Sequence, residues 1–139
     1  RKKFLGICVG MQLMVNSSLE KKNTLGFGWL SGKFKKIKTN GLDYLGREYK
    51  IPHMGWNNLQ IKDKNHPLLK DITEKEQYYF VHSFGLESDD KDQIKAYTNY
   101  SVNIPAIIAK ENYVGVQFHP EKSGNSGQKF IYNWLKWIP

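Results

Sequence analysis

Short apolar runs dominate the pattern of hydrophobic and polar positions, and they predict strands between an early and a late helix. Residues 4–9 form a compact apolar run with β-branched members, which is typical of a buried strand. Apolar positions between residues 10 and 19 then recur with helical spacing. Near the other end, residues 127–138 place their apolar side chains on one face of a predicted helix, and Pro139 follows it.

Alternating and aromatic segments fill the chain between these two predicted helices. They predict strands over residues 27–37, 44–51, 56–61, 77–84, 94–97, 106–110 and 113–118. Residues 23–26 and 39–41 have the composition of turns, and we expect a loop over residues 52–57.

The order of these elements indicates the fold class. One strand–helix unit followed by strands cannot complete a parallel sheet, because parallel strands need long crossover connections. We therefore expect a single α/β domain over residues 1–139 that forms the C-terminal portion of a larger unit, with further strand–helix units upstream of Arg1. The absence of an initiator methionine fits the same interpretation.

Composition narrows the class of protein. Hydrophobic residues make up 40% and charged residues 24% of the chain, a globular balance that excludes a disordered chain, a collagen-like chain and a coiled coil. No uninterrupted apolar stretch reaches about 18 residues, so the sequence predicts no transmembrane helix. The single cysteine excludes an internal disulfide framework and fits a reducing, cytoplasmic compartment.

The chain is basic, with 21 Lys and Arg against 13 Asp and Glu and a net charge of +8. Lysines surround Phe34 and Ile37 within residues 33–38. Nucleic-acid binding is one interpretation of such a run. A strand with one solvated face is the other, and it is the common reason for alternating lysines. The four histidines show no metal-ligand spacing, so we predict no metal site.

The sharpest local motif is Gly6-Ile7-Cys8-Val9-Gly10, between the first predicted strand and helix. A nucleophile flanked by glycines in this context is typical of a nucleophile elbow. The Val9 N–H would then point to where an oxyanion forms, and the helix N-terminus should lower the pKa of the Cys8 thiol. A buried structural cysteine on a glycine-rich strand is the alternative.

A second motif lies at Gln117-Phe118-His119-Pro120-Glu121. His119 and Glu121 are two residues apart, so an extended backbone places both side chains on one face. The carboxylate could then hold the imidazole in one tautomer while the other ring nitrogen meets a thiol. The two motifs together predict a Cys8–His119–Glu121 triad, whereas a surface histidine beside an incidental glutamate is the alternative.

Three segments of the chain, residues 6–12, 79–83 and 117–121, resemble class I glutamine amidotransferases. Residues 52–57 and 119–124 are further similar to the glutaminase subunits of imidazole glycerol phosphate synthases. The resemblance covers essentially the whole chain. It implies a flavodoxin-like α/β amidotransferase domain, here without its N-terminal strand–helix units, which would supply a second oxyanion donor.

The resemblance also implies a mechanism and a set of site residues. Cys8 would attack the carboxamide of glutamine, His119 would transfer protons, and Glu121 would orient His119. The implied substrate-binding residues are Val9, Gln12, Glu20, Ser83 and Phe84. Phe84 stands where the family commonly has tyrosine, so one hydroxyl near the substrate is lost.

The same resemblance implies a partner and a pathway. Ammonia would pass to a (β/α)8-barrel synthase subunit in a heterodimer that makes imidazole glycerol phosphate for histidine biosynthesis. The residues implied to meet this subunit are Met54, Trp56, Asn57 and Lys122. Neither a metal nor an organic cofactor is implied, and we expect no nucleic-acid or membrane partner. Paralogues that deliver ammonia to a surface sugar carry the same glutaminase motifs and are the alternative pathway.

Overall fold

The computed structural model describes residues 2–139, so Arg1, the first residue of the predicted domain, lies outside the described residues. The main sheet has five strands in the order β1-β11-β10-β9-β6. These strands are Phe4–Ile7, Tyr113–Val116, Val102–Lys110, Ile94–Tyr100 and Gln60–Ile61. Strand β1 runs parallel to β11, and the other neighbours in this sheet are antiparallel.

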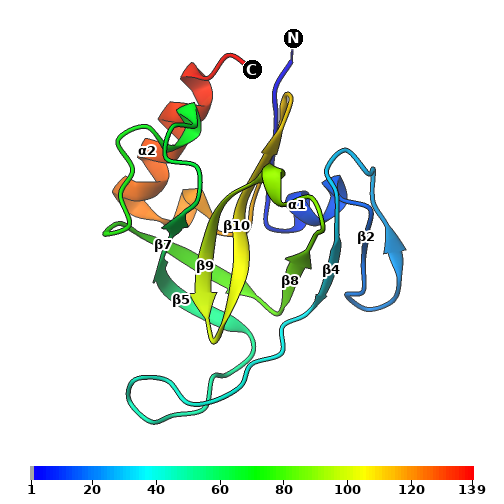
Figure 1. The fold of residues 1–139 in the computed structure, drawn as a ribbon, viewed down its shortest axis with the longest axis vertical. Helices are drawn as coiled ribbons and strands as arrows, with labels where there is room; N and C mark the ends of the chain where they lie inside the picture. The colour runs from blue at the N-terminus through cyan, green and yellow to red at the C-terminus, as the bar shows by residue number, and fades with distance from the viewer. Residues whose placement is uncertain (1) are drawn as a thin grey trace.

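Two smaller sheets flank the main one (Figure 1). The four-stranded sheet has the order β3-β2-β4-β8, and β5 pairs with β7 in a two-stranded sheet. Their strands are β2 Ser17–Ser18, β3 Thr24–Leu25, β4 Lys33–Lys36, β5 His53–Asn58, β7 Gln77–His82 and β8 Phe84–Glu87. Figure 1 shows the β2–β4 sheet and helix α2 on opposite sides of the β9–β10 hairpin.

Among residues 2–139, two α-helices and three short turns of 3-10 helix accompany these sheets. Helix α1 spans Val9–Met14 and α2 spans Gly124–Lys136, and the 3-10 turns are η1 Pro67–Leu69, η2 Lys91–Gln93 and η3 Pro120–Lys122. Phe130 of α2 packs edge-on against Phe118, and both rings are fully buried. Gly127 faces η3 so closely that an added Cβ would lie 1.9 Å from the Pro120 carbonyl oxygen. Only glycine therefore allows α2 to approach the segment that carries His119 and Glu121.

Lys3 joins the first residues of the chain to the C-terminal end of α2. Its ammonium donates to the carbonyls of Trp134 at 2.7 Å, Leu135 at 3.0 Å and Trp137 at 2.9 Å. The Trp134 carbonyl also accepts the Trp137 N–H at 3.3 Å, and a cation favours the negative end of the helix dipole.

The strand predicted over residues 27–37 is confirmed only in part: residues 27–32 form no strand, and Lys33–Lys36 form β4 with the expected solvated face. Phe34 is fully buried, Ile37 is 7% exposed, and the lysines of β4 are exposed. One of them, Lys35, pairs with Glu87 of β8 at 2.9 Å.

The predicted helix over residues 10–19 is too long. It ends at Met14, and Ser17–Ser18 join a strand instead. The reason is a competing set of partners, because the carbonyls of residues 13–16 accept backbone hydrogen bonds from residues 26, 27, 28 and 30. Long-range backbone pairing thus replaces the next helical turn.

Two predictions near the middle of the chain are wrong. Residues 44–51 form no strand, apart from one isolated bridge between Leu42 and Glu48. The loop expected over residues 52–57 is mostly strand: His53–Asn58 form β5, which pairs along its whole length with β7, and the strand predicted over 56–61 is divided between the end of β5 and β6. Non-local pairing with β7 decides the conformation of this segment, and local composition does not show it.

Smaller differences between predicted and observed element boundaries have the same cause, which is non-local strand pairing. The turn at residues 23–26 contains the two-residue strand β3, and the predicted strands at 94–97 and 106–110 lengthen into the continuous β9–β10 hairpin.

Candidate active site

Cys8 lies on the sharp connection between β1 and α1. Its backbone has φ 52° and ψ −103°, a conformation that residues with a Cβ rarely adopt. The Cys8 N–H donates to the Val116 carbonyl at 2.8 Å, which ties the turn to β11. An added Cβ on Gly6 would lie 2.4 Å from Met14 Sδ, so glycine lets the helix fold back on the strand. The geometry of the predicted nucleophile elbow is present.

The surroundings of the Cys8 thiol raise its pKa. Burial is the largest cause, since only 9% of the residue is exposed, and the charges of Glu20 and Glu121 act in the same direction. Hydrogen bonds from the Val9 N–H and from Gln117 lower the pKa but do not outweigh burial. We expected the helix N-terminus to lower the pKa of the thiol. The net shift of the pKa is upward, so this expectation is wrong for the overall value. The raised pKa favours the protonated thiol, and a thiol reacts as a nucleophile only after it loses its proton.

His119 and Glu121 lie just beyond the end of β11, beside the elbow. The His119 Nδ1 and Glu121 Oε2 atoms are 3.0 Å apart. The backbone around His119 is fixed to β7, because its N–H donates to the Tyr79 carbonyl at 2.9 Å and Ser123 Oγ donates to its carbonyl at 2.6 Å. Glu121 thus contacts the ring at Nδ1, on the side away from Nε2.

The Cys8 thiol and the His119 backbone contact the same strand, β7. Cys8 Sγ lies 4.0 Å from the Val81 carbonyl oxygen, and the His119 backbone is bonded to Tyr79 two residues earlier on β7. Parallel pairing of Ile7 with Val116 brings the ends of β1 and β11 to one edge. The predicted triad members are therefore gathered by adjacent elements.

Gln117 is a site residue that the sequence analysis did not single out. Its side chain is fully buried, and its Nε2 donates toward Cys8 Sγ at 3.8 Å. Its Oε1 atom is buried with no hydrogen-bond partner among residues 2–139. Gln117 lies two residues before His119, so strand alternation alone would have placed it on the same face as that histidine.

The predicted substrate-binding residues lie in two groups. Ser18 Oγ donates to Gln12 Oε1 at 3.3 Å and accepts the Glu20 N–H at 3.2 Å, which links Gln12 of α1 to the segment that carries Glu20. Ser83 is the one residue between β7 and β8, and Phe84 begins β8; we refer to this connection as the Ser83–Phe84 turn. The Ser83 carbonyl accepts the Ile37 N–H at 3.0 Å, which fixes this turn to the β4 side.

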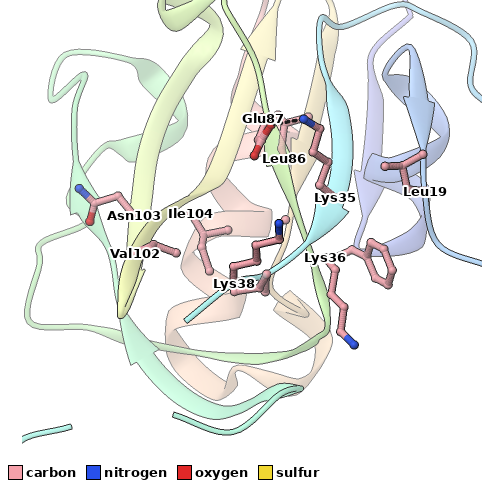
Figure 2. A pocket seen from close by; sticks show the side chains of 12 residues that line it. Leu19, Lys35, Lys36, Lys38, Leu86, Glu87, Val102, Asn103 and Ile104 are labelled. Atoms are coloured by element: carbon pink, nitrogen blue, oxygen red, sulfur yellow. Dashed lines mark ion pairs between the residues drawn. The ribbon is translucent and has the colours of Figure 1, made fainter. Parts of the chain in front are cut away.

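A groove of about 680 Å³ adjoins the second of these groups (Figure 2). Leu19, Phe84 and Ile104 contribute its apolar walls, with lysines of residues 35–38 around it. Figure 2 shows the Lys35 side chain reaching Glu87, so one of these cations is already paired within the chain.

The residues predicted to meet a partner lie on or near β5. Met54 and Trp56 are 61% and 53% exposed, and Lys122 is exposed on η3. Asn57 differs from them, because its Nδ2 donates to the Asn99 carbonyl at 2.8 Å and contacts His53 Nε2 at 3.3 Å. Asn57 therefore has an internal structural role whatever it contacts outside the chain.

Two further features concern metals and membranes. Within residues 2–139, no group of three or more His, Cys, Asp or Glu side chains is arranged to hold a metal ion. In the same part of the chain, no helix has both the length and the apolar character needed to cross a membrane.

Curated relatives match nearly the whole chain. The imidazole glycerol phosphate synthase subunit HisH of Halalkalibacterium halodurans is 44% identical over 133 residues, which cover 96% of this chain and 61% of that relative. The HisH subunit of Mesorhizobium japonicum is 45% identical over 139 residues, which cover 98% of this chain and 62% of that relative. The chain thus spans 61% to 62% of the length of these two relatives.

Solved structures and a family model agree with this similarity. PurLQS from Thermotoga maritima superposes with a TM-score of 0.68 at 19% identity, over 99% of this chain and 62% of that one. The glutaminase domain of Trypanosoma brucei CTPS with bound acivicin gives a TM-score of 0.57 at 18% identity, over 99% and 61%. At these identities the likeness confirms the predicted α/β fold. The family model "Glutamine amidotransferase class-I" matches residues 1–137, so the chain belongs to the class I glutamine amidotransferase family.

Proposed function

We propose that this protein is the glutaminase subunit of an imidazole glycerol phosphate synthase, which hydrolyses glutamine to glutamate and ammonia. The observation that carries the proposal is the position of Cys8 on a strained elbow beside a His119–Glu121 pair joined at 3.0 Å. A buried structural cysteine would not need a backbone at φ 52°.

The reaction begins with proton transfer from Cys8 to His119. Because burial raises the pKa of the thiol, His119 Nε2 must accept this proton as the sulfur attacks the carboxamide carbon. The negative charge that develops on the carboxamide oxygen is stabilised by the Val9 N–H. His119 then gives the proton to the departing nitrogen, ammonia leaves, and a glutamyl thioester on Cys8 remains.

Hydrolysis of the thioester returns the enzyme to its starting state. His119 removes a proton from water, the hydroxide attacks the thioester carbonyl, and the proton passes to the Cys8 sulfur as glutamate leaves. Glu121 accepts the Nδ1–H throughout and stabilises the imidazolium each time it forms. The chemistry uses side chains and water, with no metal or organic cofactor.

Two groups of residues would bind the glutamine. The Glu20 carboxylate would pair with the α-ammonium group, and Gln12 would hold the substrate beside it. Val9 and the turn at Ser83 and Phe84 would line the other side. The charge of Glu20 acts on the Cys8 thiol, which places this carboxylate within electrostatic range of the nucleophile.

The partner would be a (β/α)8-barrel synthase subunit in a cytoplasmic heterodimer. Exposed Met54 and Trp56 on β5 offer the apolar contacts that interface hot spots require, and Lys122 on η3 adds a cation beside the triad. The relatives are named as subunits of imidazole glycerol phosphate synthase. This name supports the histidine pathway over delivery of ammonia to a surface sugar.

Glutamate release measured with and without the barrel subunit tests this proposal. We expect the barrel subunit and its nucleotide ligand to raise glutamate release by this protein, with ammonia captured in imidazole glycerol phosphate. Hydrolysis stimulated only by an enzyme of surface-sugar amidation would contradict the pathway. The absence of hydrolysis with either partner would contradict the glutaminase activity itself.

A further inference from the structure

Two histidines outside the triad are buried side by side on neighbouring strands. His53 on β5 and His82 on β7 are direct register partners, and only 3% and 5% of their surfaces are exposed. The His53 Nδ1 and His82 Nε2 atoms are 2.8 Å apart. The proposed chemistry assigns no step to either ring, although buried polar groups of this kind are costly unless each atom has a partner.

The hydrogen-bond partners fix where each proton lies. The Phe84 carbonyl lies 3.0 Å from His82 Nδ1, and a carbonyl can only accept, so Nδ1 carries the proton. In a neutral ring Nε2 is then an acceptor, which receives the Nδ1–H of His53. By the same logic His53 Nε2 accepts from Asn57 Nδ2 at 3.3 Å. The chain of donors runs in one direction, from Asn57 through both rings to the Phe84 carbonyl.

The surroundings keep both rings neutral, as this series of hydrogen bonds requires. Burial lowers the pKa of His53 to about 3, and the charge of His82 adds to the effect. Burial lowers the pKa of His82 to about 4; the hydrogen bond to the Phe84 carbonyl acts in the opposite direction, and the neighbouring His119 lowers the pKa further. His53 is also stacked between Phe80 and Tyr100, with ring centroids 5.0 and 4.1 Å away. A second proton on either ring would face another donor.

We propose that His53 and His82 are positioning residues that hold the Ser83–Phe84 turn in the shape that binds glutamine. The bond from His82 Nδ1 closes this turn across two residues, and His53 holds the His82 ring in the orientation that makes the bond. The inference rests on the proposed function, because Ser83 and Phe84 line the glutamine site in that proposal.

Two different substitutions of His82 separate its hydrogen bond to the Phe84 carbonyl from its hydrogen bond to His53. In His82→Asn the amide nitrogen lies near the place of Nδ1 and can still donate to the Phe84 carbonyl. In His82→Gln the amide oxygen lies near the place of Nε2 and can accept from His53, but nothing donates to the Phe84 carbonyl. Both variants remove one ring from the same buried position, so a purely structural role predicts similar effects.

The readout is the rate at which a glutamine-mimicking diazoketone alkylates Cys8, as a function of reagent concentration. We expect the half-saturating concentration to be about tenfold higher for His82→Gln than for His82→Asn, which corresponds to one lost hydrogen bond. The maximal alkylation rates should be similar, since the triad is unchanged. His66→Gln is the matched control, because His66 also has a hydrogen bond to the backbone, here as acceptor of the Leu68 N–H, and also contacts a ring, at η1.

The outcomes are distinguishable. Equal half-saturating concentrations for the two His82 variants, with urea unfolding showing both folded, would overturn the positioning role. Nitrogen NMR of the unmodified protein gives an independent check, since both rings must be Nδ1–H tautomers, and an Nε2–H tautomer at His82 would also overturn it. If the unsubstituted protein is not alkylated at all, the proposed function fails, while the tautomer result still stands.

Discussion

The His119 region and the His53–His82 pair use the same side chain in opposite ways. His119 has a 19% exposed side chain and a carboxylate 3.0 Å from its Nδ1, so a positive ring has a partner of opposite charge. His53 and His82 are nearly enclosed, and each faces a neutral group that a second proton would disturb. The neighbour of the imidazole, rather than the imidazole itself, decides whether it can carry a proton during a reaction or must stay neutral.

The largest expected effect comes from removing the proposed nucleophile, Cys8, whose proton His119 would accept. Cys8→Ala should lower glutamine hydrolysis by at least about 10³-fold, because no other group in the site can form the thioester. Binding of the barrel subunit, measured by calorimetry, should be unchanged. Loss of partner binding in this variant would argue against a purely catalytic role for Cys8.

The carboxylate next to His119 gives the second largest effect. Glu121→Gln should lower kcat for glutamine hydrolysis by about 10²-fold with little change in KM, because the amide orients the ring poorly and does not stabilise the imidazolium. Asp89→Asn, which removes an exposed carboxylate on the connection after β8, is the matched control. Equal kcat values for both variants would mean that Glu121 is incidental.

The buried pair should make the protein sensitive to acid. Both histidines bind a proton with a pKa near 6.5 when unfolded but only near 3 and 4 when folded. The unfolded state therefore binds more protons between these values, so stability is complete above about pH 6.5 and falls as the pH is lowered toward 4. The loss at pH 4.5 should be about 1 to 3 kcal/mol per histidine.

Urea unfolding at pH 7 and pH 4.5 measures this loss. Replacement of both rings, in His53→Phe/His82→Phe, should flatten the pH dependence even if the variant is less stable at pH 7. A double variant with the same acid sensitivity as the parent would assign that sensitivity to other groups, such as the half-buried His66, whose pKa is also lowered mainly by burial.

The smallest predicted effect is that of substituting Gln117 on the alkylation of Cys8. Gln117→Met keeps the volume but removes the amide that donates toward Cys8 Sγ, so the pKa of the thiol should rise further and its alkylation by iodoacetamide at pH 7.5 should slow a few-fold. The pH profile of alkylation measures the shift directly. An unchanged profile would show that the 3.8 Å contact contributes nothing to the thiolate.

Sequence patterns predicted the parts of this molecule that are local. The motif around Cys8 predicted a strand, a strained turn and a helix, because glycine spacing and apolar runs act within a few residues. His119 and Glu121 were paired from their spacing of two. The class of fold followed from the order of elements and the family resemblance, and the matched family and solved structures confirm it.

Long-range pairing explains what the sequence did not show. The end of α1 is set by carbonyls that residues 26, 27, 28 and 30 occupy, and β5 exists because β7 lies beside it. The raised pKa of the Cys8 thiol depends on how many atoms surround it, which no motif encodes. The histidine pair has the same origin, since His53 and His82 meet only through the register of β5 on β7.

Alkylation by the glutamine-mimicking diazoketone, read by peptide mass spectrometry on the protein with its barrel subunit, tests the central claim most directly. The account predicts a single adduct on Cys8 that excess glutamine prevents. Such an adduct would establish the nucleophile and the substrate class together. An unlabelled Cys8 under these conditions, or labelling that glutamine does not affect, would contradict the triad and favour a structural cysteine.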